Sequence, residues 1–132
     1  MFENVLIAED HESVNFSLRR TLEDLQIPHF DYAYYCDQAL SKIKKALQVG
    51  KPYDLLITDL YFEIDGTTEQ ILDGPELIKE AKGLQSQLKI LVFSAESRPS
   101  IIRPLFDDSG IDGYVRKARR DAQELKTAVG SH

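Results

Sequence analysis

Several features are scarce in this sequence of 132 residues, and each scarcity excludes a class of protein. A lone cysteine, Cys36, cannot form an internal disulfide, which fits a reducing compartment. No cluster of cysteine and histidine residues indicates a zinc site. No apolar run approaches the ~20 residues of a membrane span, and residues 1–4 lack the basic region of a signal peptide. We therefore expect a cytoplasmic protein that does not bind a membrane.

Basic residues are also in the minority. The 22 acidic residues exceed the 16 lysine and arginine residues, which gives a net charge of −6. A duplex-binding module normally carries a basic face, so direct binding of nucleic acid by this chain is disfavoured. A metal cation or a basic partner surface fits the charge better. The length leaves room for one ordinary domain, so we expect residues 1–132 to form a single domain.

Short apolar runs, each followed by a polar or charged residue, predict buried strands. A run without alternation is buried on both faces, which is typical of a parallel sheet covered by helices. A weaker strand is expected near 30–33. The four clear runs cover 5–8, 55–58, 90–93 and 113–116.

Amphipathic segments between these strands predict five helices. Ser13 and Asp37 are the expected N-caps of the first two, and Gly83 is the expected end of the third. Pro104 is expected to kink or shorten the fourth. The order of five β–α units predicts an α/β fold, a doubly wound, flavodoxin-like (βα)5 domain with a five-stranded parallel sheet and helices on both faces.

Four of the expected strands end in residues that can carry chemistry. These are the pair Glu9 and Asp10, then Asp59, Ser94 and Lys117. The carboxyl ends of parallel strands meet at one edge of the sheet, so we expect these side chains to converge. Carboxylates ~4 Å apart repel by about 4 kcal/mol per pair at an effective dielectric near 20. Such a cluster needs a cation or a proton, and hard oxygen ligands at a small site indicate Mg²⁺.

The same set suggests phosphoryl chemistry. A carboxylate beside Mg²⁺ can attack phosphorus and form an acyl phosphate. A hydroxyl and an ammonium group would then bind the phosphoryl oxygens and offset their charge. Each residue alone also fits an ordinary helix cap or a solvated surface lysine. The joint pattern at four strand ends favours the functional interpretation.

The motifs together resemble the receiver domain of two-component response regulators. They are the acidic pair after Val-Leu-Ile-Ala, Asp59 after Leu-Leu-Ile-Thr, Ser94-Ala95 after Val-Phe, and the segment 110–117. The resemblance covers residues 3–129. It implies that Asp59 is the phosphoacceptor, that Ser94 and Lys117 sense the phosphoryl group, and that Tyr114 is the switch aromatic. The metal ligands that it implies are Glu9, Asp10, Asp59 and the backbone carbonyl of Tyr61.

By resemblance, the protein is a phosphoacceptor signalling switch rather than an enzyme, with weak autophosphatase activity at most. A sensor histidine kinase or a phosphotransfer protein would donate the phosphoryl group. The surface of the fourth helix, fifth strand and fifth helix would then repack to control an output, with homodimerisation as one route. The domain either stands alone or is a piece of a longer regulator.

Two other functions remain open at this stage. One is a small phosphatase or phosphotransferase with an aspartyl nucleophile, although such enzymes commonly place a second acid where Tyr61 stands. The other is an interaction module of receiver fold that works without phosphorylation, against which the complete set of site residues argues.

The sequence departs from the family pattern at three places near the site, of which the mildest is the acidic pair, Glu-Asp rather than Asp-Asp. Ala118 stands where the family usually has a proline after its lysine, so the isomer of the Lys117–Ala118 bond is open. The loop after Asp59 is longer than usual, because the matching Asp-Gly pair is at 73–74, although 65–66 offers a competing alignment. The inserted residues, within 62–72, are either a tolerated surface loop or a lid or docking element.

Overall fold

The structure is a computed structural model that describes residues 2–62, 73–118 and 121–130. Five strands alternate with five helices along the chain. Their bounds are β1 (Asn4–Ala8), α1 (Glu12–Asp24), β2 (His29–Ala33), α2 (Cys36–Gln48), β3 (Leu55–Thr58), α3 (Gly74–Leu84), β4 (Lys89–Ser94), α4 (Pro99–Asp107), β5 (Gly113–Arg116) and α5 (Asp121–Gly130).

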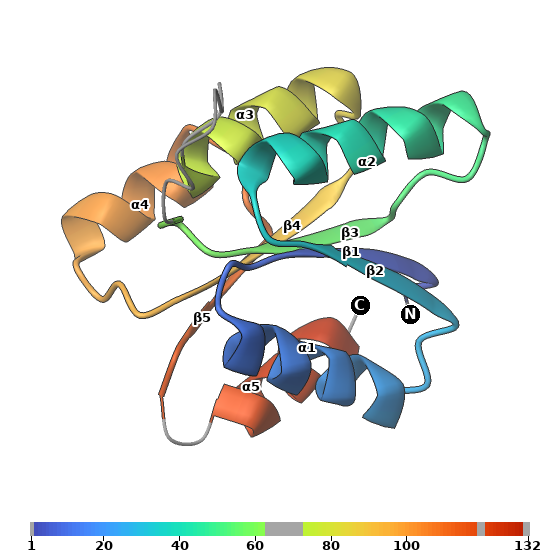
Figure 1. The fold of residues 1–132 in the computed structure, drawn as a ribbon. Helices are drawn as coiled ribbons and strands as arrows, with labels where there is room; N and C mark the ends of the chain where they lie inside the picture. Colours follow the sequence, from blue (N-terminus) through green and yellow to red (C-terminus); the bar gives the residue numbers. More distant parts are fainter. Residues whose placement is uncertain (1, 63–72, 119–120, 131–132) are drawn as a thin grey trace.

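The five strands form one parallel sheet with the order β2-β1-β3-β4-β5. Helices α2, α3 and α4 cover one face, and α1 and α5 cover the other (Figure 1). The predicted doubly wound (βα)5 fold is therefore confirmed, including the weak strand near 30–33. After β1, the chain adds β2 on one side of it and then adds β3, β4 and β5 on the other side. The strand order therefore reverses between β1 and β3.

Two apolar cores lie on either side of the sheet, because neighbouring strand residues point to opposite faces. In β1, Leu6 and Ala8 face the core under α2, α3 and α4, whereas Val5 and Ile7 face the core under α1 and α5. The other central strands divide in the same way. Burial on both faces explains why these strands are continuous apolar runs. Among the described helices, none has the length and apolar character needed to cross a bilayer.

Some predicted helix ends are wrong by one or two residues. Helix α1 begins at Glu12 without a side-chain cap, so Ser13 is inside the helix. Asp37 is in the first turn of α2, where its charge still complements the helix dipole. Helix α3 continues past Gly83 to Leu84. Helix α4 runs through Pro104 and ends at Asp107, so the proline does not break it.

Candidate functional site

The carboxyl ends of β1, β3 and β5 bring three charged side chains into direct contact. The Lys117 Nζ atom donates to Glu9 Oε1 at 2.6 Å and to Asp59 Oδ2 at 2.7 Å. Strand register places them there, because Ala8 pairs with Thr58 and the following residues are therefore neighbours. The Lys117 amide donates to the Ser94 carbonyl at 2.8 Å, which holds the lysine beside the end of β4.

Both acids are deeply buried, so their charges are poorly solvated. Glu9 is 1% exposed and Asp59 is 6% exposed. The backbone of the following residues stabilises both carboxylates, with the Leu60 amide donating to Asp59 Oδ1 at 2.6 Å and the Asp10 amide to Glu9 Oε2 at 3.1 Å. The convergence predicted for the strand ends is thus found for Glu9, Asp59 and Lys117.

The protonation states of Glu9 and Lys117 follow from burial and neighbouring charges together. Burial raises the pKa of Glu9 to about 7, and the nearby carboxylates of Asp59 and Asp10 add to the rise, while Lys117 opposes it. Burial alone would lower the pKa of Lys117, but its hydrogen bonds to Asp59 and Glu9 outweigh this and raise that pKa. The ammonium group therefore stays charged, and Glu9 is the member of the cluster that exchanges a proton near neutral pH.

Asp10 lies next to Glu9 and contacts a histidine that the sequence analysis does not include among the site residues. The His11 Nδ1 atom is 3.0 Å from Asp10 Oδ1 and 4.0 Å from Glu9 Oε2. Ligand atoms of Glu9, Asp10 and His11 lie within 4.8 Å of one another. The position of His11 directly after the acidic pair is the only sequence signal for this contact.

The donor set fits a hard divalent cation. Glu9, Asp10 and Asp59 supply carboxylate oxygens from neighbouring strand ends, and Lys117 is the one cation that contacts Glu9 and Asp59 among the described residues. Lys117 contacts two of the three acids, and the negative charges of Asp59 and Asp10 add to the rise that burial causes in the pKa of Glu9. Oxygen ligands of this kind suit Mg²⁺. No contact tests the expected role of the Tyr61 carbonyl, which stays a prediction.

Ser94 and Tyr114 lie beside this cluster rather than in contact with Asp59. Ser94 is fully buried, and its hydroxyl accepts from the Glu96 amide at 3.3 Å. The Tyr114 hydroxyl donates to the Glu96 carbonyl at 2.6 Å, and burial raises the pKa of Tyr114. Both predicted switch residues thus contact the same segment, the β4–α4 loop (residues 95–98).

The β4–α4 loop contains a second charged contact that the sequence analysis missed. The Glu96 carboxylate accepts from Arg98 Nη2 at 2.6 Å and from the Tyr61 hydroxyl at 2.6 Å. The bond to Arg98 is the first cause of the lowered pKa of Glu96, and the bond to Tyr61 is the next. Tyr61 therefore connects the segment after Asp59 to the β4–α4 loop by its side chain.

A close backbone approach places Gly74 directly beside Asp59. A Cβ atom on Gly74 would collide with the Asp59 carbonyl oxygen and would lie 2.7 Å from Leu60 Cα. The Gly74 amide donates to the Leu60 carbonyl at 2.9 Å, and Asp73 caps α3 by accepting from the Glu76 amide at 3.0 Å. The pair Asp73-Gly74 thus lies next to Asp59. The competing pair at 65–66 and most of the inserted loop, 63–72, lie outside the described residues.

The structure also gives the isomer of the bond before Ala118, which stands where the family usually has proline. Every peptide bond in the described segments is trans, including the one between Lys117 and Ala118. Lys117 reaches both carboxylates from this trans backbone. Alanine in place of the usual proline is therefore compatible with the site.

Comparisons with known proteins agree with this architecture. The isolated receiver domain of RcsB from Salmonella enterica serovar Typhimurium, in a structure with the phosphomimetic BeF3⁻, is 27% identical, with a TM-score of 0.75 over 97% of this chain and 86% of that chain. Two further structures show the same fold. The chemotaxis regulator CheY4 of Vibrio cholerae is 22% identical, with a TM-score of 0.75 over 99% of this chain and 98% of that chain. The phosphorylated cyanobacterial phytochrome response regulator RcpA is 17% identical, with a TM-score of 0.78 over 99% and 91%.

Sequence comparison finds no match among curated proteins. The family model of the response regulator receiver domain, in contrast, matches residues 5–130, which is nearly the whole chain. This protein therefore belongs to the response regulator receiver domain family.

Proposed function

We propose that the chain is a phosphorylation switch in which Asp59 accepts a phosphoryl group from a phosphohistidine of a partner protein. One observation carries the proposal: the Lys117 ammonium bridges the buried carboxylates of Glu9 and Asp59 at 2.6 and 2.7 Å. A buried carboxylate that already contacts a cation has a partner in place for the charge that phosphoryl transfer brings. Family membership supports the assignment at the coarser level, because receiver domains are signalling switches rather than classical enzymes.

The proposed step is a displacement at phosphorus. An Asp59 carboxylate oxygen forms the new O–P bond while the N–P bond to the partner imidazole breaks, and the released imidazole takes up a proton. Lys117 keeps its charge throughout and moves from the carboxylate oxygen to a phosphoryl oxygen. The product is an acyl phosphate, which water hydrolyses slowly, so weak autophosphatase activity accompanies the switch.

Glu9 and Asp10, whose ligand atoms lie within 4.8 Å of each other and of His11, could hold Mg²⁺ together with Asp59 and the Tyr61 carbonyl, which are the other proposed ligands. When bound, the ion would neutralise charge on the transferring phosphoryl group. The protein contributes the burial of the carboxylates and the position of Lys117. These features keep Asp59 fixed and exclude water from one side of it.

The output follows from what the new charge does to the β4–α4 loop. Ser94, Tyr114 and Tyr61 all contact Glu96 of this loop. A phosphoryl group on Asp59 would draw the Ser94 hydroxyl towards it and away from the Glu96 amide. The loop and the neighbouring α4-β5-α5 surface would then repack and change their affinity for a partner or a second copy of the chain.

The partners and setting of this switch belong to the proposal too. A sensor histidine kinase or a phosphotransfer protein supplies the phosphoryl group in the cytoplasm, and residues 1–132 act as one receiver domain. Neither membrane nor nucleic acid binding by this chain is part of the mechanism.

The test is labelling with acetyl phosphate and Mg²⁺, followed by intact mass. The unmodified protein should gain one phosphoryl group, and Asp59→Asn should gain none. Asp107→Asn is a matched control, because it removes an exposed carboxylate at the end of α4 and should leave labelling unchanged. Labelling of Asp59→Asn at the rate of the unmodified protein would refute the assignment.

A second measurement separates the switch from an interaction module that needs no phosphorylation. Mg²⁺ and beryllofluoride together should shift the amide resonances of Ser94, Tyr114 and the β4–α4 loop in two-dimensional NMR spectra. Unchanged spectra would favour the interaction module. Turnover of a generic phosphate ester would favour a phosphatase instead.

A further inference from the structure

A hollow lined by three lysines lies at the amino-terminal edge of the sheet, opposite the acidic cluster. It has a volume of ≈ 390 Å³ between α2 and the edge strand β2, and its wall includes the first residues of β1 and β2, Asn4 and His29. A second hollow of ≈ 410 Å³ shares Asn4, His29 and Lys51 with it, so the depression continues along this edge. Volumes of this size are typical of small-molecule sites.

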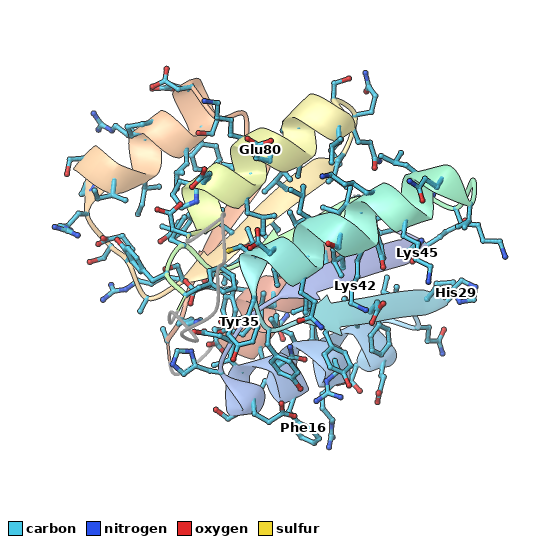
Figure 2. The ribbon with its side chains drawn as sticks, turned by 45° about the horizontal axis from the view of Figure 1, so that its top comes forward. Phe16, His29, Tyr35, Lys42, Lys45 and Glu80 are labelled. Carbon is cyan, nitrogen blue, oxygen red and sulfur yellow. The ribbon has the colours of Figure 1, made fainter. Side chains whose placement is uncertain are left out.

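The hollow concentrates positive charge in a protein whose net charge is negative. Lys42 and Lys45 are three residues apart on α2 and thus share one helix face, and Figure 2 shows Lys45 near His29 at the start of β2 and Lys42 further along the strand. Lys51 joins them from the loop after α2. Lys45 and Lys51 form no ion pair with any residue that the structure describes. The two acids along the depression are Asp31 in the first hollow and Glu3 in the second.

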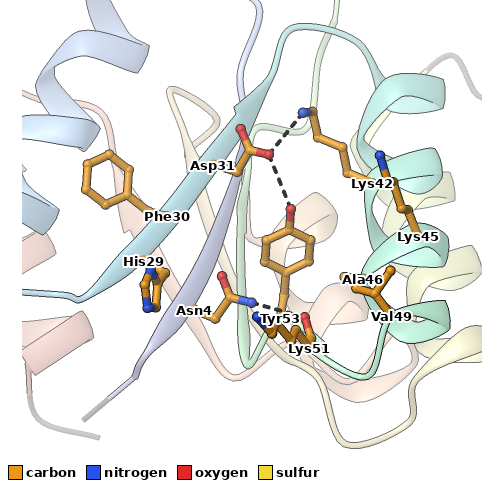
Figure 3. A pocket seen from close by; sticks show the side chains of 10 residues that line it. All are labelled: Asn4, His29, Phe30, Asp31, Lys42, Lys45, Ala46, Val49, Lys51 and Tyr53. Carbon is orange, nitrogen blue, oxygen red and sulfur yellow. Dashed lines mark hydrogen bonds and ion pairs between the residues drawn. The ribbon is translucent and has the colours of Figure 1, made fainter.

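Asp31 lines the hollow and binds two of its donors. Its Oδ2 atom accepts from Lys42 Nζ at 3.0 Å and from the Tyr53 hydroxyl at 3.4 Å (Figure 3). Burial, followed by the Asp31 charge, raises the pKa of Tyr53 to about 12, so the hydroxyl keeps its proton and remains a donor. An arriving anion would therefore meet lysine ammonium groups and a phenol hydroxyl, with Asp31 as its competitor.

We propose that this hollow, the β2–α2 pocket, binds a small molecule that carries a pyrophosphate or polyphosphate group. Lysine ammonium groups bind phosphate as point charges, and three of them, Lys42, Lys45 and Lys51, line the described pocket. Two phosphate groups match the two lysines, Lys45 and Lys51, that have no carboxylate of their own. The Tyr53 ring and the Ala46 side chain provide an apolar wall for the rest of the molecule.

The first test is titration with inorganic pyrophosphate in buffer without Mg²⁺, followed by two-dimensional NMR spectra. Amide shifts should concentrate at His29, Asp31 and the second half of α2. Lys45→Ala should weaken binding about fivefold, which corresponds to the loss of one partly exposed charge contact. Lys44→Ala is the matched control, because it removes the same charge from the same helix at an exposed position outside the pocket. Its affinity should change less than twofold.

Asp31→Asn provides a test in which pyrophosphate affinity should rise rather than fall. The amide can still accept the hydrogen bond that the Tyr32 amide makes with Oδ1 at 2.8 Å, so the strand should be preserved. Removing the competing charge should strengthen pyrophosphate binding about fivefold. A variant that only damages the fold would weaken binding, so an increase identifies the charge competition itself.

Three results would overturn the proposal. The first is that pyrophosphate does not bind. The second is that Lys44→Ala and Lys45→Ala lose the same amount of affinity, and the third is that the amide shifts are confined to the acidic cluster at the other edge of the sheet. Two further results would support it and identify the source of the phosphate. ADP binding more tightly than pyrophosphate indicates a nucleotide that uses the apolar wall, and equal affinity indicates a free polyphosphate.

Discussion

The buried carboxylate of Glu9 should make the stability of this domain depend on pH in an unusual direction. Glu9 is 1% exposed, and burial followed by neighbouring carboxylates raises its pKa from 4.5 to about 7. Replacing it by glutamine keeps the shape of the side chain and one of the two oxygens that accept from Lys117 and the Asp10 amide. Glu9→Gln therefore removes the ionisation and one acceptor, and only the ionisation gives a change with pH.

The direction follows from the linkage between proton binding and folding. Between pH 4.5 and 7 the folded protein holds a proton on Glu9 that the unfolded chain has released, so the free energy of unfolding falls as pH rises. The full loss is reached above the folded pKa, where both states are ionised. A rise from 4.5 to about 7 corresponds to about 3 kcal/mol. A typical domain has only 5–15 kcal/mol of stability, so this loss is measurable.

Urea unfolding monitored by circular dichroism, at several values of pH from 5 to 8 and with EDTA present, measures this effect. The free energy of unfolding of Glu9→Gln minus that of the unmodified protein should rise by about 2.5 kcal/mol from pH 5 to pH 8, because at pH 5 the unfolded chain has already released most of this proton. The difference cancels contributions from histidines and other acids that both proteins share. Glu80→Gln, which changes an exposed glutamate on α3, should show no such trend.

If the difference in free energy of unfolding between Glu9→Gln and the unmodified protein were constant from pH 5 to pH 8, the reasoning would be refuted. Glu9 would then ionise alike in the folded and unfolded states. A difference that falls with pH would refute it more strongly. It would mean that Lys117 outweighs burial and that the ionised pair stabilises the fold.

Two further predictions use the same region. Gly74→Ala should lower the free energy of unfolding by about 2 kcal/mol, because its Cβ atom would collide with the Asp59 carbonyl, and acetyl phosphate labelling should also decline. Gly83→Ala, whose Cβ atom would meet open space in the same helix, should stabilise by up to about 1 kcal/mol in the same urea titration. Mg²⁺ should raise the melting temperature more at pH 8 than at pH 6, since cation binding requires the ionised form of Glu9. Scanning calorimetry would measure this, and an equal rise at both values of pH would contradict it.

The fold was predictable because its strongest determinants are local and repeated. Apolar runs such as 55–58 have no polar alternation, which requires cover on both faces, and the two observed cores provide it. The ends of the helices were less predictable. Ser13 is a good cap by residue type, yet α1 begins one residue earlier at Glu12, because the path of the chain out of β1 sets the start. Tertiary structure thus overrides a weak local preference.

The acidic site was predictable only to the extent that topology fixes it. Residues directly after parallel strands must meet at one edge, which is why Glu9, Asp59 and Lys117 are found in contact. The contact between Tyr61 and Glu96 had no such signal. The two residues are 35 positions apart and meet only because neighbouring loops lie side by side. The pairing of Asp31 with Lys42 in the β2–α2 pocket is a similar case.

The two edges of the sheet handle charge in opposite ways, and the difference bears on function. At the carboxyl edge, Glu9 and Asp59 are almost fully buried, so their repulsion is strong and a cation or a proton must offset it. At the amino edge, Lys45 and Lys51 are exposed, so water screens them and they cost the fold little. The first arrangement suits a switch, because a small change in charge among buried groups has a large effect on the free energy of the fold. The second suits reversible capture of an anion, because the fold does not depend on whether the β2–α2 pocket is filled.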